Sequence, residues 1–262
     1  MTNRKAGATR DRSAAPYTRP VTRLASSAER GRFITIEGPE GAGKTSQAAR
    51  LEAALRARGM DVLGTREPGG TALGERIRDL LLAPSAQPID PLADALLFNA
   101  ARRQLVEEVI EPSLAAGTTV LCARFADSTR AYQGYGGGLP IDELQRLEDI
   151  ATGGLRPDLT ILLDLAVEIG LARKAPDDQT RFEIGFDVDF HRRVRNGFLA
   201  MAAAEPHRFV VLDATDDEDA VAGRILRAVE AVLDPATEGA RTSVAEVRRA
   251  PSEPNRPTVR TT

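Results

Sequence analysis

The chain has few of the side chains that support redox, metal or disulfide chemistry: its 262 residues include one cysteine, two histidines and no tryptophan. Cys122 has no partner for an internal disulfide, and its position in an apolar run predicts a buried side chain and not a nucleophile. No apolar run reaches the roughly 20 residues of a membrane span. No apolar segment follows the basic N-terminus, as it would in a secretory signal. We therefore expect a reduced, cytoplasmic protein.

Neither sign of charge dominates the sequence. Lysine and arginine total 35 and aspartate and glutamate total 38, which gives a formal net charge of -3. This balance does not favour a nucleic acid or a membrane as partner, whereas a small phosphate ligand needs only a local basic site. The two histidines, His191 and His207, are expected on the surface and without a functional role.

Apolar strands alternate with helices between two polar ends. Residues 1–30 and 235–262 have little apolar periodicity and are predicted to be disordered tails. Residues 31–234 are predicted to form one α/β domain, a five-stranded parallel sheet covered by helices on both faces. The predicted strands are 32–37, 62–66, 118–122, 159–165 and 209–213. The predicted helices are 45–58, 71–82, 91–116 (long, and open to a break), 141–152, 186–205 and 217–233.

A glycine-rich loop follows the first predicted strand. Gly38–Thr45 reads GPEGAGKT, which matches G-x-x-x-x-G-K-[ST] between a strand and a helix. This pattern predicts a P-loop NTPase fold, in which backbone N–H groups and the positive end of the helix surround a phosphate. Lys44 can reach the β- and γ-phosphates, and the Thr45 hydroxyl can ligate Mg²⁺. The predicted ATP-binding residues are Gly38, Pro39, Glu40, Gly41, Ala42, Gly43, Lys44, Thr45 and Ser46.

A P-loop alone does not distinguish a GTPase, a motor, a transporter ATPase and a kinase. The chain has no N-K-x-D guanine motif, which disfavours a GTPase, and no second ATPase module. The small size of the predicted domain fits a nucleoside monophosphate kinase.

Three further segments carry polar or aromatic side chains that suit a ligand, and the first and third follow strand ends, where ligands bind in open α/β sheets. Arg66–Thr71 reads REPGGT, Phe98–Gln104 reads FNAARRQ, and Arg124–Gly134 reads RFADSTRAYQG. An arginine at a strand end can hold a phosphate through two hydrogen bonds. Phe98 and Arg102 are four residues apart on a predicted helix and share a face that suits a planar base. These segments predict an acceptor site beside the P-loop.

In this order, the segments resemble the thymidylate kinase family over residues 32–233. The resemblance includes PDLTILLD at Pro157–Asp164 and an arginine-bearing lid at about residues 172–184. It implies transfer of the γ-phosphate of ATP to dTMP, which gives dTDP and ADP. It also implies Mg²⁺ as cofactor and a homodimer, for which the long helix over 91–116 is a plausible interface.

The resemblance implies roles for single residues as well. The expected catalytic residues are Lys44, Arg124 and the lid residues Arg173 and Arg181. The expected substrate-binding residues are Glu40 for the sugar 3′-hydroxyl, Arg66 and Arg124 for the acceptor phosphate, Phe98 for stacking on thymine, Arg102 and Gln133 for the base edge, Tyr132 for the deoxyribose, and Thr129. Because the acceptor phosphate is already ionised at neutral pH, no general base is expected.

The sequence departs from the family pattern at three positions. Ala123 stands where the family usually has an aspartate that helps to organise Mg²⁺, Gly137 where it often has an arginine, and Thr180 where the lid motif usually has an aspartate. Asp164, at the end of a predicted strand, could support the metal site or cap the strand. Ala123 and Gly137 leave open a low-activity nucleotide-binding paralogue that acts as a sensor or scaffold. A kinase for another nucleoside monophosphate is a separate alternative.

Overall fold

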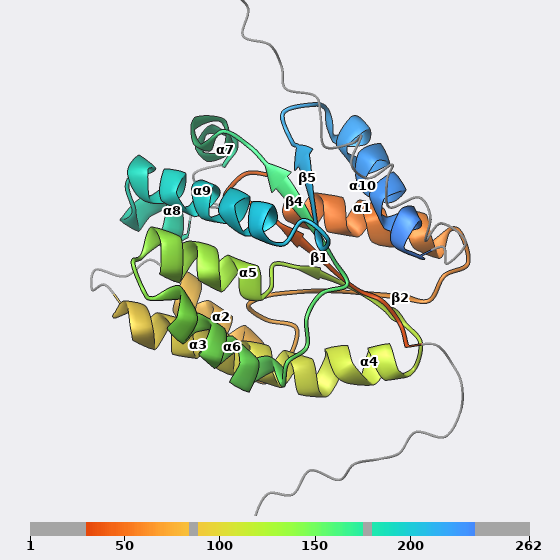
Figure 1. Cartoon of the computed structure of the whole chain (residues 1–262), viewed down its shortest axis with the longest axis horizontal. Coiled ribbons are helices and arrows are strands. Elements are labelled where there is room, and N and C mark those ends of the chain that lie inside the picture. Colours follow the sequence, from red (N-terminus) through yellow and green to blue (C-terminus); the bar gives the residue numbers. More distant parts are fainter. Residues whose placement is uncertain (1–29, 84–88, 175–179, 234–262) are drawn as a thin grey trace, which may run out of the picture.

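The computed structural model describes residues 30–83, 89–174 and 180–233, and its centre is a single parallel sheet (Figure 1). The strands run in the order β2-β3-β1-β4-β5, so the strand before the glycine loop is central. Their bounds are β1 (Phe33–Glu37), β2 (Val62–Arg66), β3 (Thr119–Ala123), β4 (Leu159–Asp164) and β5 (Phe209–Asp213). Each lies within one residue of its predicted range, and the predicted sheet is confirmed.

Helices cover both faces of the sheet, as predicted (Figure 1). On one face, α1 (Lys44–Arg56) and α10 (Glu218–Leu233) pack on the inward side chains of β1 and β4. On the other face, α9 (Val188–Ala204) and the long helix that begins at Pro91 complete the core. The remaining helices are α2 (Ala72–Leu82), α5 (Ala126–Thr129), α6 (Ile141–Thr152), α7 (Val167–Arg173) and α8 (Arg181–Gly185).

The helix predicted over 91–116 is continuous in direction but changes its hydrogen-bond pattern. It consists of α3 (Pro91–Leu105), a π-helical segment η1 (Val106–Ile110) and α4 (Glu111–Ala115). Pro112 has no N–H to donate, and the Glu111 N–H bonds to the Val106 carbonyl five residues back. The π-helical segment therefore absorbs the proline without a separate loop.

The polar segment after β3 is a helix, which was not predicted. α5 continues into a second π-helical segment, η2 (Arg130–Gly136), and most of its side chains are buried. Helices α7 and α8, on either side of residues 175–179, were not predicted either. In α5 and η2 the polar residues point inward, so the apolar periodicity that identifies a helix is missing.

A buried charge cluster fixes α5 against the sheet. The Asp127 carboxylate accepts hydrogen bonds from Arg208 (Nη1–Oδ2 2.7 Å, Nη2–Oδ1 3.0 Å) and from Arg130 (Nη2–Oδ1 2.6 Å). Arg208 also donates to Thr160 on β4. Because a buried charge that loses its partner is costly, these contacts hold the position of the α5–η2 helix.

The sequence predicts a buried Cys122 and surface positions for both histidines. Cys122 is fully buried, as predicted. His191 was predicted on the surface and is buried, because its ring packs on Phe190 and its Nε2 lies 3.0 Å from the Phe182 carbonyl. His207 is exposed, as expected.

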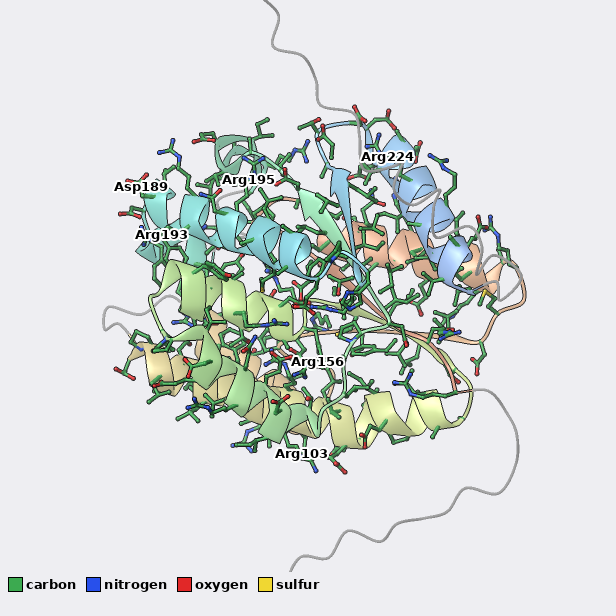
Figure 2. All side chains as sticks on the ribbon, in the orientation of Figure 1. Arg103, Arg156, Asp189, Arg193, Arg195 and Arg224 are labelled. Atoms are coloured by element: carbon green, nitrogen blue, oxygen red, sulfur yellow. The ribbon has the colours of Figure 1, made fainter. Side chains whose placement is uncertain are left out.

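Asp164 forms a two-bond ion pair with Arg195 of α9, which is labelled in Figure 2, so it caps the strand through a salt bridge. The tails over 1–30 and 235–262 lie outside the described residues, apart from Arg30. None of the helices in the described part of the chain has the length and apolarity to cross a bilayer.

Candidate active site

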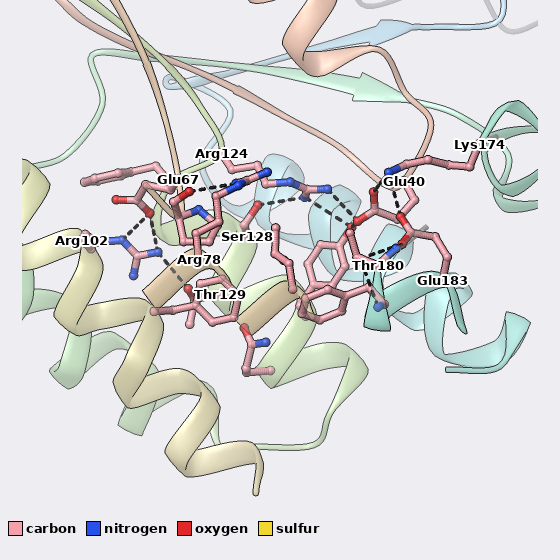
Figure 3. Close-up of a pocket in the computed structure, with 17 residues that line it drawn as sticks. Glu40, Glu67, Arg78, Arg102, Arg124, Ser128, Thr129, Lys174, Thr180 and Glu183 are labelled. Atoms are coloured by element: carbon pink, nitrogen blue, oxygen red, sulfur yellow. Dashed lines mark hydrogen bonds and ion pairs between the residues drawn. The ribbon is translucent and has the colours of Figure 1, made fainter. Parts of the chain in front are cut away.

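The glycine loop between β1 and α1 borders two cavities at the C-terminal edge of the sheet. The α3 cavity, of about 110 Å³, is lined by Glu40 together with residues of α2, α3, α5, η2 and α8 (Figure 3). The α10 cavity, of about 490 Å³, is lined by Gly41, Ala42 and Gly43 together with Arg173 and the segment from Ala214 to Val221. The loop thus lies where a ligand in one cavity can meet a ligand in the other.

The loop has the conformation that its glycines permit. Gly43, at the start of α1, has φ 83°, a left-handed value that side chains rarely adopt. Lys44 is buried beneath the loop, and its Nζ donates to the Pro39 carbonyl at 2.6 Å. Burial and the nearby Arg124 lower the pKa of Lys44 to about 7. Thr45 is exposed in the first turn of α1.

The loop also touches α7 backbone to backbone. A methyl group built on Gly41 would lie 2.0 Å from the Gly170 carbonyl oxygen, and one on Gly170 would lie 2.1 Å from the Glu40 carbonyl oxygen. A side chain at either position would separate α7 from the loop. This contact places Arg173, at the end of α7, beside the α10 cavity, where its Nη1 donates to the Ala214 carbonyl at 3.1 Å.

Glu40 is the charged centre of the α3 cavity. Its Oε1 accepts hydrogen bonds from Arg124 Nη2 and from the Tyr132 hydroxyl, both at 2.7 Å, and Lys174 Nζ lies 3.9 Å from its Oε2. Burial opposes ionisation of this carboxyl, but Arg124, Lys44 and the Tyr132 hydroxyl outweigh burial and hold its pKa well below the usual range. Glu40 therefore remains an anion at neutral pH.

Arg124 follows β3 with φ 67°, and it alone among the described non-glycine residues has a positive φ. This left-handed backbone costs roughly 1–2 kcal/mol for a residue with a side chain. It turns the guanidinium into the cavity, where it contacts Glu40 and lies 5.2 Å from the centre of the Tyr132 ring. Strain at a residue that faces a cavity is typical of functional sites.

Glu37, the last residue of β1, is buried behind the P-loop. Its Oε1 accepts from the Phe125 N–H and its Oε2 from the Ser128 hydroxyl, both at 2.7 Å. Burial, reinforced by the negative charge of Asp127, raises its pKa to about 7. These two bonds connect the central strand to the start of α5.

The far end of the α3 cavity carries Arg102, whose side chain is almost fully buried (Figure 3). Its guanidinium donates to Glu67 (Nε–Oε2 2.9 Å), Asn99 (Nη1–Oδ1 3.0 Å) and Thr129 (Nη2–Oγ1 2.9 Å). Burial raises the pKa of Glu67 to about 7 in spite of Arg102. Arg102 is therefore a fixed donor that lines the cavity.

Aromatic rings and an amide complete the cavity. The Phe182 ring, from α8, lies 5.4 Å from Tyr132 and 6.4 Å from Phe98 between ring centres. Gln133 lines the cavity from η2, and its Nε2 donates to Asp94 Oδ2 at 2.8 Å. The cavity thus combines apolar ring surfaces with a polar amide, the kind of lining that suits a planar apolar ligand with polar edges.

The structure brings most of the predicted acceptor residues together. Those that line the α3 cavity are Glu40, Phe98, Arg102, Arg124, Thr129, Tyr132 and Gln133. Arg66 lies outside the cavity lining, and its Nη2 pairs with Glu75 Oε2 at 2.9 Å. Arg181 pairs with Asp94 and also lies outside the lining. The roles expected for Arg66 and Arg181 stay predictions.

Other lining residues were not singled out from the sequence. Arg78 reaches the cavity from α2 and donates to the Pro68 carbonyl at 2.9 Å, and Lys174 reaches it from the end of α7. Glu67 and Phe182 line it as well. Glu67 belongs to REPGGT and Phe182 follows Arg181 of the lid, so the sequence motifs could have pointed to both residues. Nothing in the sequence around Arg78 indicates a ligand.

The electrostatics of the site suit a phosphate chain and not a metal held by protein side chains alone. Arg78, Arg124 and Lys174 converge on the α3 cavity, and Lys44 lies under the glycine loop next to it. Within residues 30–83, 89–174 and 180–233 there is no group of three or more His, Cys, Asp or Glu side chains that could hold a metal ion. Phosphoryl transfer by positioning and charge neutralisation is the chemistry that this arrangement supports.

Comparisons with known proteins agree with this site. The thymidylate kinase family model matches residues 36–225. The thymidylate kinase of Deinococcus radiodurans is 55% identical over 199 residues, which cover 76% of this chain and 96% of that protein. That of Synechococcus sp. (strain JA-2-3B'a(2-13)) is 51% identical over 207 residues, covering 79% and 98%.

A solved structure supports the same assignment. The crystal structure of thymidylate kinase from Ehrlichia chaffeensis aligns with a TM-score of 0.61 and 35% sequence identity, covering 78% of this chain and 99% of that chain. The fold and the family predicted from the motifs are confirmed. Sheet, glycine loop, cavity and relatives agree, and the chain belongs to the thymidylate kinase family.

Proposed function

We propose that the protein transfers the γ-phosphate of ATP to dTMP, with ATP along the α10 cavity and P-loop and dTMP in the α3 cavity. The observation that carries this proposal is that Arg124 and Lys44 both contact the glycine loop, which borders the two cavities. Arg124 faces the α3 cavity on a strained backbone, and Lys44 is buried under the loop that borders both. Two cations at this junction can neutralise charge on the phosphates of both substrates.

The reaction needs little covalent chemistry from the protein. An oxygen of the dTMP phosphate attacks the γ-phosphorus, a new P–O bond forms, and the bond to the ADP oxygen breaks with its electron pair leaving on ADP. The attacking oxygen is already ionised, so no side chain has to remove a proton. Lys44 and Arg124 would stabilise the charge of the transferring group, with Arg173 approaching from the lid.

The expected cofactor is Mg²⁺, and the residues at the glycine loop fit it. Thr45 presents an exposed hydroxyl, which makes no hydrogen bond to another described side chain, next to the buried Lys44. Magnesium prefers such hard oxygen ligands and completes its shell with waters and phosphate oxygens. Bound there, it would add positive charge near the phosphates.

The acceptor would be recognised by its base, sugar and phosphate in turn. Phe98 would stack on thymine, with Arg102 and Gln133 at the base edge. Glu40 would receive the 3′-hydroxyl, and Tyr132, whose hydroxyl contacts Glu40, would lie against the deoxyribose. Thr129 supports Arg102. The acceptor phosphate would contact Arg124, with Arg66 and the newly identified Arg78 as further cations.

The assembly and location are part of the same proposal. Helices α2, α3 and α6 pack side by side and carry exposed apolar side chains at Leu73, Leu80, Leu92, Leu96 and Ile150. Burying such a surface against a second copy would stabilise a homodimer in the cytoplasm. In analytical ultracentrifugation the wild-type chain should sediment as a dimer, and Leu96→Glu should shift it toward monomer.

A coupled assay of ADP release with ATP, Mg²⁺ and dTMP tests the proposed activity. Turnover should depend on dTMP, and Lys44→Ala should lower it by ~10²-fold or more, as expected for one preorganised charge contact. Arg58→Ala is the control and should keep full activity, because it removes an exposed cation just beyond the C-terminal end of α1. ADP release that is equal without dTMP, or near-normal turnover of Lys44→Ala, would refute the mechanism.

A further inference from the structure

The helix α3 presents three site residues at a regular spacing. Asp94, Phe98 and Arg102 are each four residues apart, so they follow one face of the helix. Arg102 bonds to Thr129 and Asp94 bonds to Gln133, which lie four residues apart on the α5–η2 helix. Phe98 therefore lies between two polar contacts that join the same pair of helices.

The contact between Asp94 and Gln133 decides how the glutamine amide is oriented. An ionised carboxylate has no hydrogen to donate, so only the NH₂ side of the amide can face Asp94. The Gln133 Nε2 indeed donates to Asp94 Oδ2 at 2.8 Å, and both side chains are buried. The carbonyl oxygen of the amide must then be the atom on the opposite side, and no donor from a described residue occupies it.

Asp94 is itself held in place by α8. Its second oxygen, Oδ1, is paired with the guanidinium of Arg181, so both oxygens of the carboxylate are engaged. Burial raises the pKa of Asp94, and Arg181 opposes this shift by favouring the charged form. Asp94 also lies in the first turn of α3, where the helix dipole favours a negative charge. Arg181 thus helps Asp94 to remain a pure acceptor.

We propose that Asp94, held by Arg181, is a positioning residue that sets the base specificity of the acceptor site by fixing the Gln133 amide with its carbonyl oxygen toward the cavity. The inference rests on the proposed function, in which Arg102 and Gln133 meet the base edge. The site then offers a donor from Arg102 beside an acceptor from Gln133. Thymine and uracil present the complement, a carbonyl O4 and an N3–H, whereas cytosine presents an amino group and a bare N3.

This pairing rejects cytosine at both contacts, because each would bring two donors or two acceptors together in a buried site. If the amide turned around, its NH₂ could donate to N3 of cytosine, and half of the discrimination would be lost. Thymine and uracil have the same edge, so the orientation of the amide does not separate dTMP from dUMP. Asp94 therefore controls the preference for dTMP over dCMP and leaves the preference between dTMP and dUMP unchanged.

The test compares kcat/KM for dTMP, dCMP and dUMP in Asp94→Asn, which keeps the size of the side chain but can accept or donate. The dTMP to dCMP ratio should fall by ~10-fold, close to the net contribution of one hydrogen bond. The dTMP to dUMP ratio should stay constant. Asp94→Glu, which remains an acceptor only, should keep the wild-type dTMP to dCMP ratio. If Asp94→Asn does not fold, Asp94→Ala, which leaves no group to orient the amide, answers the same question.

Gln133→Leu separates this inference from the function on which it rests. A lower kcat/KM for dTMP in Gln133→Leu, together with a lower dTMP to dCMP ratio of kcat/KM in Asp94→Asn, supports the proposed function and the role of Asp94. Weaker use of dTMP in Gln133→Leu with an unchanged ratio in Asp94→Asn overturns the role of Asp94 alone. An unchanged kcat/KM for dTMP in Gln133→Leu would show that Gln133 does not contact the base, and it would overturn the inference as well. An equal loss for dTMP, dCMP and dUMP in Asp94→Asn would show a merely structural role.

Discussion

Arg124 Nη2 lies 2.7 Å from Glu40 Oε1, and it reaches this position from a left-handed backbone at φ 67°. The contact joins the end of β3 to the glycine loop, two segments that are 84 residues apart in the sequence. It fixes the guanidinium in the α3 cavity against the glycine loop, and it keeps the Glu40 carboxylate charged.

Two variants of Arg124 separate the strain from the charge. Arg124→Ala and Arg124→Gly both remove the guanidinium, so both should lose ~10²-fold or more in turnover. Glycine adopts the left-handed conformation without strain, so the Gly variant should be more stable than the Ala variant by ~1 kcal/mol. Urea unfolding followed by circular dichroism measures the difference. Equal stability of the two variants would mean that the backbone at residue 124 relaxes when its side chain is lost.

Arg102 is expected to matter for stability as well as for binding. Arg102→Ala would leave the Glu67 carboxylate buried without its cation, which costs about 3–5 kcal/mol for such pairs. The double change Arg102→Met with Glu67→Gln removes both charges, so it should recover much of the lost stability but not the affinity for dTMP. Thermal melting and calorimetric titration with dTMP and with ATP measure the two effects. Loss of ATP binding in the double variant would contradict the assignment of Arg102 to the acceptor.

Glu37 should make the stability depend on pH. Its pKa rises from the usual 4.5 to about 7 in the folded protein, mainly because the carboxyl is buried. Between these values the folded state binds more protons than the unfolded state, so the free energy of unfolding falls as the pH rises from 4.5 to 7. Glu37→Gln keeps an acceptor for the Phe125 N–H and does not titrate.

The stability difference between Glu37→Gln and the wild type should therefore shift in favour of the variant across this window, by up to ~3 kcal/mol, and stay level above it. Urea unfolding at about pH 5, 6, 7 and 8, which spans the range between the two pKa values of Glu37, measures the shift. Glu143→Gln, which changes an exposed carboxylate on α6, is the control. Parallel curves for Glu37→Gln and the wild type would show that Glu37 is charged throughout.

Ala123 offers a way to improve the site. It ends β3, is nearly buried, and lies between Ile36 of β1 and Arg66 of β2 in the sheet. A carboxylate here would add a hard oxygen ligand for Mg²⁺ or its waters. Ala123→Asp should raise turnover by ~10-fold, about 1.4 kcal/mol of barrier, and should tighten the Mg²⁺ dependence of ATP binding measured by calorimetry. Ala123→Asn has the same shape without the charge, and an equal gain from it would contradict a role for the carboxylate.

The sheet, the glycine loop and its neighbouring helix could be predicted because their signals are local. β1 and β4 are continuous apolar runs, and GPEGAGKT has its meaning within eight residues. The α5–η2 helix could not be predicted, because its polar side chains point inward and it switches to π-helical bonding. His191 was placed wrongly because its partner, the Phe182 carbonyl, belongs to a helix that the sequence did not indicate.

The residues of the candidate site also fall into those that a local motif indicates and those that it does not. Residues within motifs, such as Arg124 and Gln133, could be assigned to the candidate site from the sequence, although the left-handed backbone of Arg124 leaves no trace there. Asp94 and Arg78 were missed because their partners are distant or are backbone atoms. Asp94 meets Gln133 across 39 residues and Arg181 across 87. Such contacts depend on how the helices pack, which no local pattern records.

The buried thiol of Cys122 makes the protein convenient for labelling. It is the single cysteine of the chain, it is fully buried in β3, and burial raises its pKa well above the usual value, so few molecules carry the reactive thiolate. Cysteines introduced at exposed positions such as Ile184 on α8 and Asp142 on α6 would then be the ones that a maleimide dye modifies. A donor and acceptor dye at these two sites would report the distance from α8 to the body of the protein, with the native thiol left in place.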